Sequence, residues 1–401
     1  MPLRALLTAY RQVNAACAAT FVGEYAHAAS TASPHDLCPS MLDWIFSAQW
    51  PLWPSIVSFA IAAGIVAWLG IKMGRLAQVL ARRTGMGEAL TGALLLGLST
   101  SIPGVVAVVT AGVNDQPEVA VSTGLGGIIA QTSFLVIADL LYKRHNLEYD
   151  ATTPDNMATG MVLISMLMLV VVALVSPEIS VFGIHPATIA LPLAYLGGLH
   201  VVNRIRKAPG WLAVHKDEHD AEQPTDPERI PPPEEAHGED ATYTHLGNGA
   251  LAARFAVVAA VVALCGWVLA RSGMSIGAEF GLADSLVGSL LIGQATSLPE
   301  LLTAVAAVRI GAPVLAIGDI VGGNMFDVLF VAIGDVAYPE GSIYHAVSDQ
   351  SAFLAAMGVL ATTMLLLGLL RRQKRGFLHV GFEGTAIFLV YIGGYVALFF
   401  W

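Results

Sequence analysis

Long apolar runs separated by short polar turns dominate the pattern of this chain. A helix that crosses a bilayer needs about 20 mostly apolar residues, and ten runs approach or exceed that length. They cover residues 54–72, 88–112, 118–141, 157–176, 180–203, 250–270, 284–308, 314–335, 351–370 and 379–400. The pattern therefore predicts an all-α polytopic membrane protein with ten transmembrane helices, bounded by loop signals such as Pro339-Glu340-Gly341.

One long hydrophilic stretch, residues 205–248, interrupts the apolar pattern. It contains Pro231-Pro232-Pro233 and ten of the 30 acidic residues, which predicts a disordered acidic, Pro-rich cytoplasmic linker. Three of its four histidines could bind metal, but among so many acids they are expected to be solvated; they are His215, His219 and His237.

The first 50 residues form a separate N-terminal extracytoplasmic segment. Residues 5–29 are moderately apolar but interrupted by polar side chains. Three interpretations remain: an amphipathic surface helix, which we favour, a poor signal sequence, and an over-extended start. Cys17 and Cys38 lie in this segment and allow a disulfide between them, whereas Cys265 lies in an apolar run and is expected to be packed there.

Composition and charge fix the environment and orientation. The chain has 401 residues, 55% of them hydrophobic and 12% charged, which excludes a soluble globular protein of this size. With the N-terminus outside, 17 of the 20 Lys and Arg residues fall in inside loops and 3 in outside loops. The positive-inside rule then favours both termini outside, in a bacterial inner membrane. No basic patch interleaved with aromatic residues is present, so nucleic acid is not expected as a partner.

The linker divides the membrane part into residues 51–204 and 249–401, with five helices in each half. An odd number of crossings in each half gives the halves opposite orientations, as in many secondary transporters. A shift of 196 residues aligns Thr100-Ser101-Ile102-Pro103 with Thr296-Ser297-Leu298-Pro299, and Gly126-Gly127 with Gly322-Gly323. The sequence thus predicts two inverted-topology five-helix repeats.

Two motifs of the second half place carboxylates where hydrocarbon is expected. Gly293-Gln294-Ala295-Thr296-Ser297-Leu298-Pro299-Glu300 combines a helix-breaking Pro with hydroxyls and an acid, and Asp327 ends the run from Gly318 to Asp327. Intramembrane acids commonly mark an ion path, and Na⁺ and Ca²⁺ prefer mixed oxygen ligands. We expect Glu300 and Asp327 to meet at mid-membrane, and Gly322-Gly323 to permit close helix approach.

These motifs resemble the second α-repeat of the cation/Ca²⁺ exchanger superfamily, the sodium/calcium exchangers. The resemblance covers nearly the whole chain apart from its first 50 residues. It implies ten helices, two inverted repeats and antiport of Ca²⁺ against Na⁺ or H⁺, with the cations as substrates and no cofactor. Glu300 and Asp327 would then be cation ligands, and Thr296 and Ser297 would supply carbonyl and hydroxyl oxygens.

The first half departs from the family pattern. Gly104 replaces a family glutamate, and Gln131 stands where the family has Asn or Asp, while Thr100 and Ser101 match the family pattern. By the resemblance, Thr100, Ser101 and Gln131 are the first-half candidates for cation ligands. In the second half, Asp319 replaces the usual asparagine and adds an acid near the site. Loss of a carboxylate weakens Ca²⁺ binding more than Na⁺ binding. The Pro103/Pro299 register therefore predicts that Gly104→Glu raises divalent affinity.

Alternative interpretations remain for several of these residues. Glu300 and Asp327 also fit a structural pair with Gln131, and Thr100 and Ser101 also fit hydroxyls bonded to their own helix. Asp139 and Asp335 lie at predicted helix ends and are expected to be solvated, whereas His185 and His200 are expected to be interfacial or packed.

Two other functions compete with antiport. An intramembrane aspartyl protease would carry Gly-x-Gly-Asp, but Ala replaces the first Gly before both Asp319 and Asp335, so an enzyme is not expected. A non-transporting sensor or scaffold fits the missing acid at position 104, as does an exchanger selective for a monovalent or another divalent cation. The expected partners are metal cations and the lipid bilayer; the sequence leaves the oligomeric state open.

Overall fold

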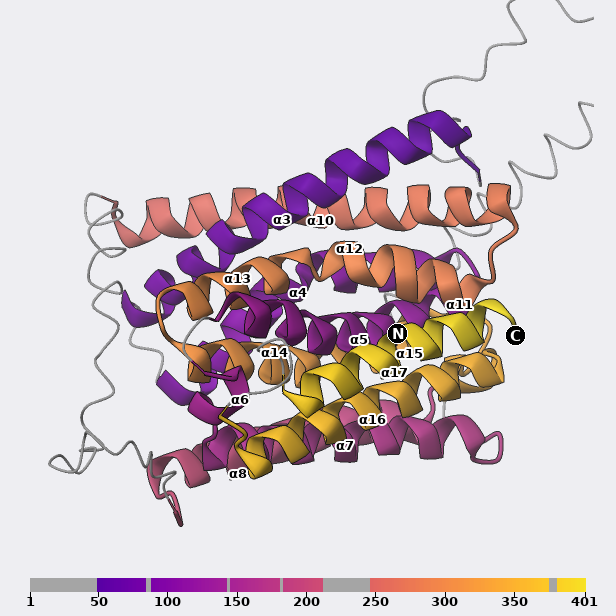
Figure 1. Ribbon diagram of the computed structural model, residues 1–401. Helices are drawn as coiled ribbons and strands as arrows, with labels where there is room; N and C mark the ends of the chain where they lie inside the picture. The colour runs from indigo at the N-terminus through magenta and orange to yellow at the C-terminus, as the bar shows by residue number, and fades with distance from the viewer. Residues whose placement is uncertain (1–48, 84–87, 143–144, 181–182, 212–245, 375–380) are drawn as a thin grey trace, which may run out of the picture.

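The computed structural model describes residues 49–83, 88–142, 145–180, 183–211, 246–374 and 381–401. Most of the N-terminal segment and of the acidic linker, with Cys17, Cys38 and all four linker histidines, lies outside the described residues. Every secondary-structure element within them is a helix. The described part forms a bundle of long helices whose N-terminal and C-terminal halves interleave (Figure 1).

A helix or a broken helix coincides with each of the ten apolar runs. In the N-terminal half these are α3 (Leu52–Arg83), α4 (Glu88–Val113), α5 (Pro117–Leu141), α7 (Pro154–Val175) and α8 (Pro186–Lys207), with a short α6 (Leu147–Asp150). The C-terminal half begins with α10 (Asn248–Phe280) and a broken helix of α11 (Asp284–Leu286), η2 (Val287–Gly293), α12 (Gln294–Thr296) and α13 (Leu298–Arg309). It continues with α14 (Pro313–Asp327), α15 (Leu329–Ala337), η3 (Ile343–His345), α16 (Asp349–Arg371) and α17 (Phe382–Phe399).

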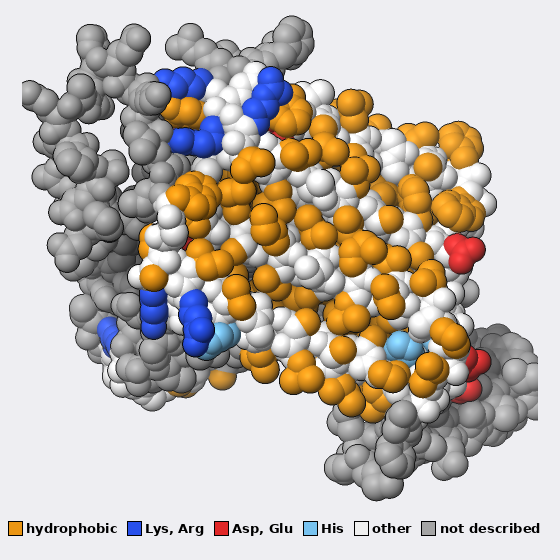
Figure 2. Space-filling view, turned by 90° about the horizontal axis from the view of Figure 1, so that it is seen from below, with side chains coloured by type: hydrophobic (Ala, Val, Ile, Leu, Met, Phe, Trp, Pro, Cys, Tyr) orange, Lys and Arg blue, Asp and Glu red, His pale blue; other side chains and the backbone are white. Residues whose placement is uncertain are grey.

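Several of these helices are long and apolar enough to cross a membrane. Seven meet that criterion among the described residues, and eight do if the broken helix from Asp284 to Arg309 is counted as one span. The outer faces of α7 and α8 expose large apolar side chains, including Met161, Val172, Ile189 and Leu193. Seen from below, the surface is broadly hydrophobic, with Lys and Arg gathered toward one end (Figure 2). The chain is an integral, multi-pass membrane protein.

Two glycine contacts seat the long helices α3 and α10, which lie side by side, against the Pro-containing segments (Figure 1). A Cβ at Gly70 of α3 would lie 2.5 Å from the Pro299 ring, and one at Gly266 of α10 would lie 2.3 Å from the Pro103 carbonyl oxygen. Gly70 and Gly266 are 196 residues apart, as are Pro103 and Pro299. A close contact between a glycine and a proline therefore occurs at corresponding positions of the two halves.

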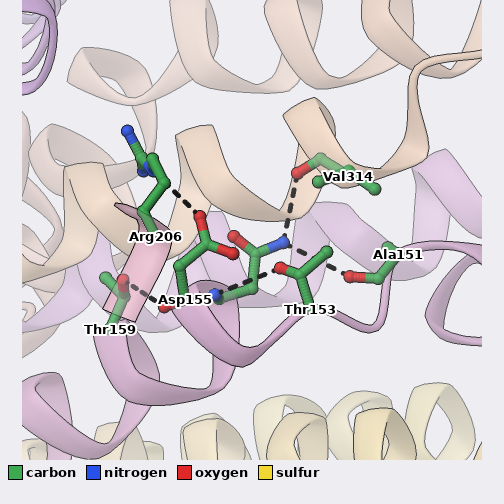
Figure 3. Close-up of polar contacts among 7 residues, drawn as sticks. Ala151, Thr153, Asp155, Thr159, Arg206 and Val314 are labelled. Carbon is green, nitrogen blue, oxygen red and sulfur yellow. Dashed lines mark hydrogen bonds and ion pairs between the residues drawn. The ribbon is translucent and has the colours of Figure 1, made fainter. Parts of the chain in front are cut away.

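The corner between α6 and α7 ties three helices together (Figure 3). The Thr153 hydroxyl caps α7 by accepting the backbone N–H of Asn156 at 3.3 Å. The Asn156 amide donates to the carbonyl oxygens of Ala151 and Val314, at 3.3 and 3.2 Å, which fixes the start of α14. Asp155 pairs with Arg206 of α8 at 3.0 Å. This corner anchors the end of α14 opposite to Asp327.

Asp139 and Asp335 are buried caps, which corrects the expectation that both are solvated. Each side chain is at most 1% exposed. Asp139 accepts the backbone N–H of Leu147 at 2.7 Å, and Asp335 accepts that of Ile343 at 2.8 Å, each eight residues further along. Asp335 also accepts from the His185 backbone N–H at 3.0 Å and from the Thr188 hydroxyl at 2.6 Å. His185 is packed beside Asp335 and is 6% exposed, and Cys265 is buried as expected.

The surroundings of Asp139 hold two further buried acids, Glu148 and Glu383, at most 2% exposed. Burial raises the pKa of Glu148 well above its ordinary value, and the nearby carboxyl groups of Asp139 and Glu383 raise it further. A carboxyl group whose pKa is raised by folding stabilises the fold at low pH, and this stabilisation is lost as the pH rises through the raised pKa.

We therefore expect Glu148→Gln to make thermal stability less dependent on pH. The melting temperature of the wild-type protein should fall as the pH rises above the ordinary range of a glutamate, and that of the variant should fall less. Tryptophan fluorescence of detergent-solubilised protein between pH 5 and pH 9 measures both curves. Glu178→Gln, at an exposed position, is the matched control; parallel curves for wild type and Glu148→Gln would contradict the prediction.

Candidate cation-binding site

The Thr-Ser-Leu-Pro-Glu motif lies at a break in its helix. The segments Asp284–Thr296 and Leu298–Arg309 meet at an angle of 45°, and Val287–Gly293 forms a π-helical turn, a feature often found at functional sites. Pro299 has no N–H to continue the helical ladder, while the Thr296 hydroxyl donates back to the carbonyl oxygens of Ile292 and Gly293, at 3.0 and 3.1 Å. The break places Glu300 in the first turn of α13.

Close packing of α5 against this broken helix brings the first-half residues to it. A Cβ at Gly126 would lie 2.2 Å from the Ser289 Cα, and one at Gly293 would lie 2.7 Å from the Thr123 carbonyl oxygen. The expectation of close approach at Gly322-Gly323 is wrong for Gly322, because a Cβ there would meet nothing within 4 Å. The tight glycine contact is made by Gly126 of the first half, where the backbones of two helices touch.

A small pocket lies where α4, α5, the broken helix and α14–α15 meet. Its cavity volume is about 10 Å³, which is room for about one water-sized occupant. Its lining residues are Ser101, Gly104, Thr123, Gly127, Gln131, Thr296, Ser297, Glu300, Asp327 and Phe330. Six of the seven residues expected at the site are therefore brought together. The seventh, Thr100, does not line the pocket, but its side chain lies within hydrogen-bonding reach of Glu300.

Asp327 is held by side chains from the first half. Ser101 donates to Asp327 Oδ1 at 2.8 Å, and Gln131 Nε2 donates to Asp327 Oδ2 at 2.6 Å and to Ser297 Oγ at 3.1 Å. Gln131 and Asp327 are 196 residues apart and occupy corresponding positions in the two halves. The carboxamide thus positions the acid, and each half contributes to the same pocket.

Two acceptors in this pocket have no hydrogen-bond donor in the described part of the protein. They are Glu300 Oε2 and Gln131 Oε1, both fully buried. Buried polar atoms are nearly always satisfied, and no Lys, Arg or His is among the described residues that line the pocket. Unsatisfied acceptor oxygens around a space of this size are what a cation would coordinate. The donor set is carboxylate, amide and hydroxyl oxygen, which suits a hard cation such as Na⁺ or Ca²⁺.

Asp319, the extra acid of the second half, is not among the residues that line the pocket. Its Oδ2 accepts a hydrogen bond of 2.8 Å from the hydroxyl of Thr303, which lies one helical turn after Glu300 in α13. Asp319 therefore does not take the place of the acid that is missing at Gly104. Among the described residues, no cluster of three or more His, Cys, Asp or Glu side chains has the arrangement of a metal site.

Phe330 and Thr123 line the pocket but carry no signal in the sequence, since both lie among apolar residues of helical runs. Phe330 also changes the interpretation of position 104. A Cβ at Gly104 would lie 2.5 Å from Phe330 Cε2 and 2.8 Å from Cζ. The ring occupies the space that a new side chain would enter, so the predicted gain in divalent affinity from Gly104→Glu requires Phe330 to move.

The fold and the pocket define a class: polytopic helical membrane proteins with a buried, oxygen-lined site where two halves meet. A family model described as sodium/calcium exchanger protein matches residues 54–197 and 250–401, which is most of the chain. The chain belongs to the sodium/calcium exchanger protein family, within the cation/Ca²⁺ exchanger superfamily. The family consists of transporters, not of enzymes.

Curated relatives agree with this assignment. The putative antiporter CaxA of Alkalimonas amylolytica is 33% identical over 135 residues, which are 33% of this chain and 40% of that protein. The sodium/calcium exchanger MaX1 of Methanosarcina acetivorans is 28% identical over 30% of this chain and 32% of its own length. The chain thus matches less than half the length of each. The inner membrane protein YrbG of Escherichia coli K12 is 24% identical over 81% of this chain and 90% of its own.

Solved structures share the fold. The sodium-calcium exchanger NCX_Mj superimposes with a TM-score of 0.54 at 14% identity, over 86% of this chain and 99% of that one. The H⁺/Ca²⁺ exchanger CAX gives a TM-score of 0.63 at 12% identity, over 89% of this chain and 84% of that one. At these identities the likeness supports the architecture alone.

Proposed function

We propose that the protein is a secondary active cation antiporter that exchanges Ca²⁺ for Na⁺ or H⁺. The observation that carries the proposal is the pocket in which Glu300 Oε2 and Gln131 Oε1 have no donor, beside an Asp327 that is already held by Ser101 and Gln131. Glu300, Asp327, Thr296, Ser297, Ser101 and Gln131 would supply the ligands, and Thr100 would orient Glu300. The relatives named as antiporter and sodium/calcium exchanger point the same way.

The architecture in this proposal has ten membrane crossings in two inverted repeats, residues 51–204 and 249–401, joined by the cytoplasmic linker 205–248. Corresponding contacts at an offset of 196 residues support it: Gly70 with Pro299 and Gly266 with Pro103, and Asp139 with Leu147 and Asp335 with Ile343. Transport would alternate access to the pocket by moving one part of the bundle against the other.

The proposed orientation places both termini outside a bacterial inner membrane. The concentration of Lys and Arg at one end of the surface supports it (Figure 2), as does the basic last turn of α8, which contains Arg204, Arg206 and Lys207. Cytoplasmic loops of membrane proteins carry such an excess of basic residues. Labelling of a Trp401→Cys variant in intact cells, with a thiol reagent that does not cross the membrane, would test the outer location of the C-terminus.

Flux through reconstituted protein tests the proposed function. The full chain is purified into proteoliposomes, and uptake of ⁴⁵Ca²⁺ is followed with an outward Na⁺ gradient, an outward H⁺ gradient, or neither. We expect uptake with at least one gradient and only background uptake without one. Protein-free liposomes provide the baseline, and background uptake with both gradients would contradict the proposal.

A non-transporting cation sensor is the second candidate, and one observation favours it. Position 104 has no acid, and Phe330 fills the adjoining space, so the first half supplies no carboxylate to the pocket. A sensor would bind Ca²⁺ in a calorimetric titration of the detergent-solubilised protein and yet give no gradient-driven flux. Binding together with flux would exclude it.

A further inference from the structure

Phe330 is wedged between two glycines of the first half. Its Cβ would lie 2.9 Å from a Cβ at Gly124 of α5, and its ring edge would lie 2.5 Å from a Cβ at Gly104 of α4. The side chain is 4% exposed and lines the pocket. A side chain any larger than that of glycine at position 104 or 124 would displace the ring.

The Phe330 ring also contacts a second aromatic ring. Phe326 packs its ring against that of Phe330, with 6.2 Å between centroids and an interplanar angle of 90°, and Tyr195 of α8 packs edge-on against Phe326 at 5.9 Å. Three aromatic rings thus run from α8 to the pocket. Phe330 is a fixed wall of the site, because an aromatic ring cannot rotate away from such contacts without disturbing its neighbours.

This wall lies where the internal repeat would bring another acid. Gly104 is 196 residues before Glu300 and corresponds to it, as Pro103 corresponds to Pro299. Glu300 lines the pocket from the second half. At the corresponding position of the first half, Gly104 has no side chain, and the edge of the Phe330 ring occupies the space beside it. The fold repeats here while the carboxylate does not.

The described pocket lining therefore carries at most two negative charges. Glu300 and Asp327 are its only ionisable carboxyl groups, and the other lining side chains are neutral. Asp319 is bonded to Thr303 outside the pocket. A buried site within the low-dielectric membrane interior is stabilised when its charge is neutralised, and two carboxylates are neutralised by two positive charges.

We propose that Gly104 and Phe330 limit the site to two carboxylates, so that each cycle exchanges one divalent cation for two monovalent charges and moves no net charge across the membrane. The inference rests on the proposed function and adds its charge stoichiometry. It makes Phe330, which bears no oxygen ligand, a determinant of coupling. The monovalent charges are carried by Na⁺ or by protons, and the two gradients of the experiment separate these.

Transport under a clamped membrane potential tests the inference. Proteoliposomes with the full chain are loaded with an outward Na⁺ or H⁺ gradient, and K⁺ with valinomycin sets the potential at zero or at about 100 mV, inside negative. We expect the final ⁴⁵Ca²⁺ accumulation ratio to differ less than twofold between the two potentials. One net charge per cycle would change that ratio about 50-fold, since 100 mV acts on one charge with about 2.3 kcal/mol.

Substitutions then test whether Phe330 and Gly104 make the accumulation ratio independent of the membrane potential. The double variant Gly104→Glu/Phe330→Ala adds a third acid and the room for it, and we expect its accumulation ratio to become dependent on potential. Phe330→Ala alone adds room without charge and should remain independent of potential. Phe134→Ala is the matched control, because Phe134 lies 196 residues before Phe330 and is buried outside the pocket.

The outcomes separate the two proposals. Gradient-driven uptake by wild-type protein that depends strongly on potential overturns the charge stoichiometry and leaves the antiporter in place. Uptake absent under both gradients overturns the antiporter itself. A double variant that transports without any dependence on potential overturns the role of Gly104 and Phe330. The wild-type measurement requires no substitution, so it decides even if the double variant does not fold.

Discussion

Replacing Glu300 by glutamine is expected to lower Ca²⁺ affinity at least about 100-fold, about 2.7 kcal/mol, and to abolish Ca²⁺ flux. Glu300 is buried in the pocket, and its Oε2 has no donor in the described part of the protein. At an effective dielectric of about 20, a unit charge about 4 Å from a divalent ion contributes roughly 8 kcal/mol before desolvation is counted. Calorimetric titration and ⁴⁵Ca²⁺ flux measure the two effects.

The matched control for this substitution is Glu279→Gln, at an exposed position near the end of α10. It should bind and transport as the wild type does, because Glu279 is not among the pocket residues. Glu300→Asp keeps the charge but withdraws it by one methylene, and its affinity should fall between those of wild type and Glu300→Gln. Wild-type affinity in Glu300→Gln would remove Glu300 from the ligand set.

Replacing Gly126 by alanine is expected to destabilise the folded transporter by about 1–3 kcal/mol, the usual range for overpacking, or by more. The new Cβ would lie 2.2 Å from the Ser289 Cα and 2.7 Å from its carbonyl oxygen, so helix backbone has to move. Because the next residue of α5, Gly127, lines the pocket, the shift should weaken Ca²⁺ binding as well. Thermal unfolding in detergent and calorimetry measure these changes.

The internal repeat provides the control for this packing. Gly322 corresponds to Gly126 at the offset of 196 residues, yet a Cβ there would meet nothing within 4 Å. Gly322→Ala should therefore be neutral, or stabilising by up to about 1 kcal/mol, because alanine favours a helix interior over glycine by that amount. Equal stability of the two variants would mean that the contact between Gly126 and Ser289 does not hold the site together.

Much of the site follows from the sequence because its chemistry is costly in lipid. Glu300 and Asp327 stand out as acids within apolar runs. Pro299 predicts a break in its helix, and the structure has a 45° bend there. Gln131 is found by its place in the repeat and in the family pattern, and it does line the pocket. These residues are recognisable one by one, whatever their neighbours.

The residues that sequence reasoning placed wrongly depend on partners distant in the chain. Asp139 and Asp335 look like solvated helix ends, but each caps a turn eight residues further along and is buried beneath it. Gly322-Gly323 looks like a close-contact pair, but the close contact is at Gly126. An apolar residue such as Phe330 gives no local sign that its ring meets Gly104, because both lie in runs of similar hydropathy.

The sequence by itself determined the membrane class, the helical runs, the offset of 196 residues and the acids of the site, because each is a local departure from what a bilayer permits or a repetition along the chain. The tertiary structure alone decided which side chains share the pocket and that Ser101 and Gln131 bind Asp327. It also decided that the Phe330 ring fills the space beside Gly104. The physical reason is distance: these contacts join residues about 200 positions apart, and their geometry depends on how closely glycine lets two helices approach.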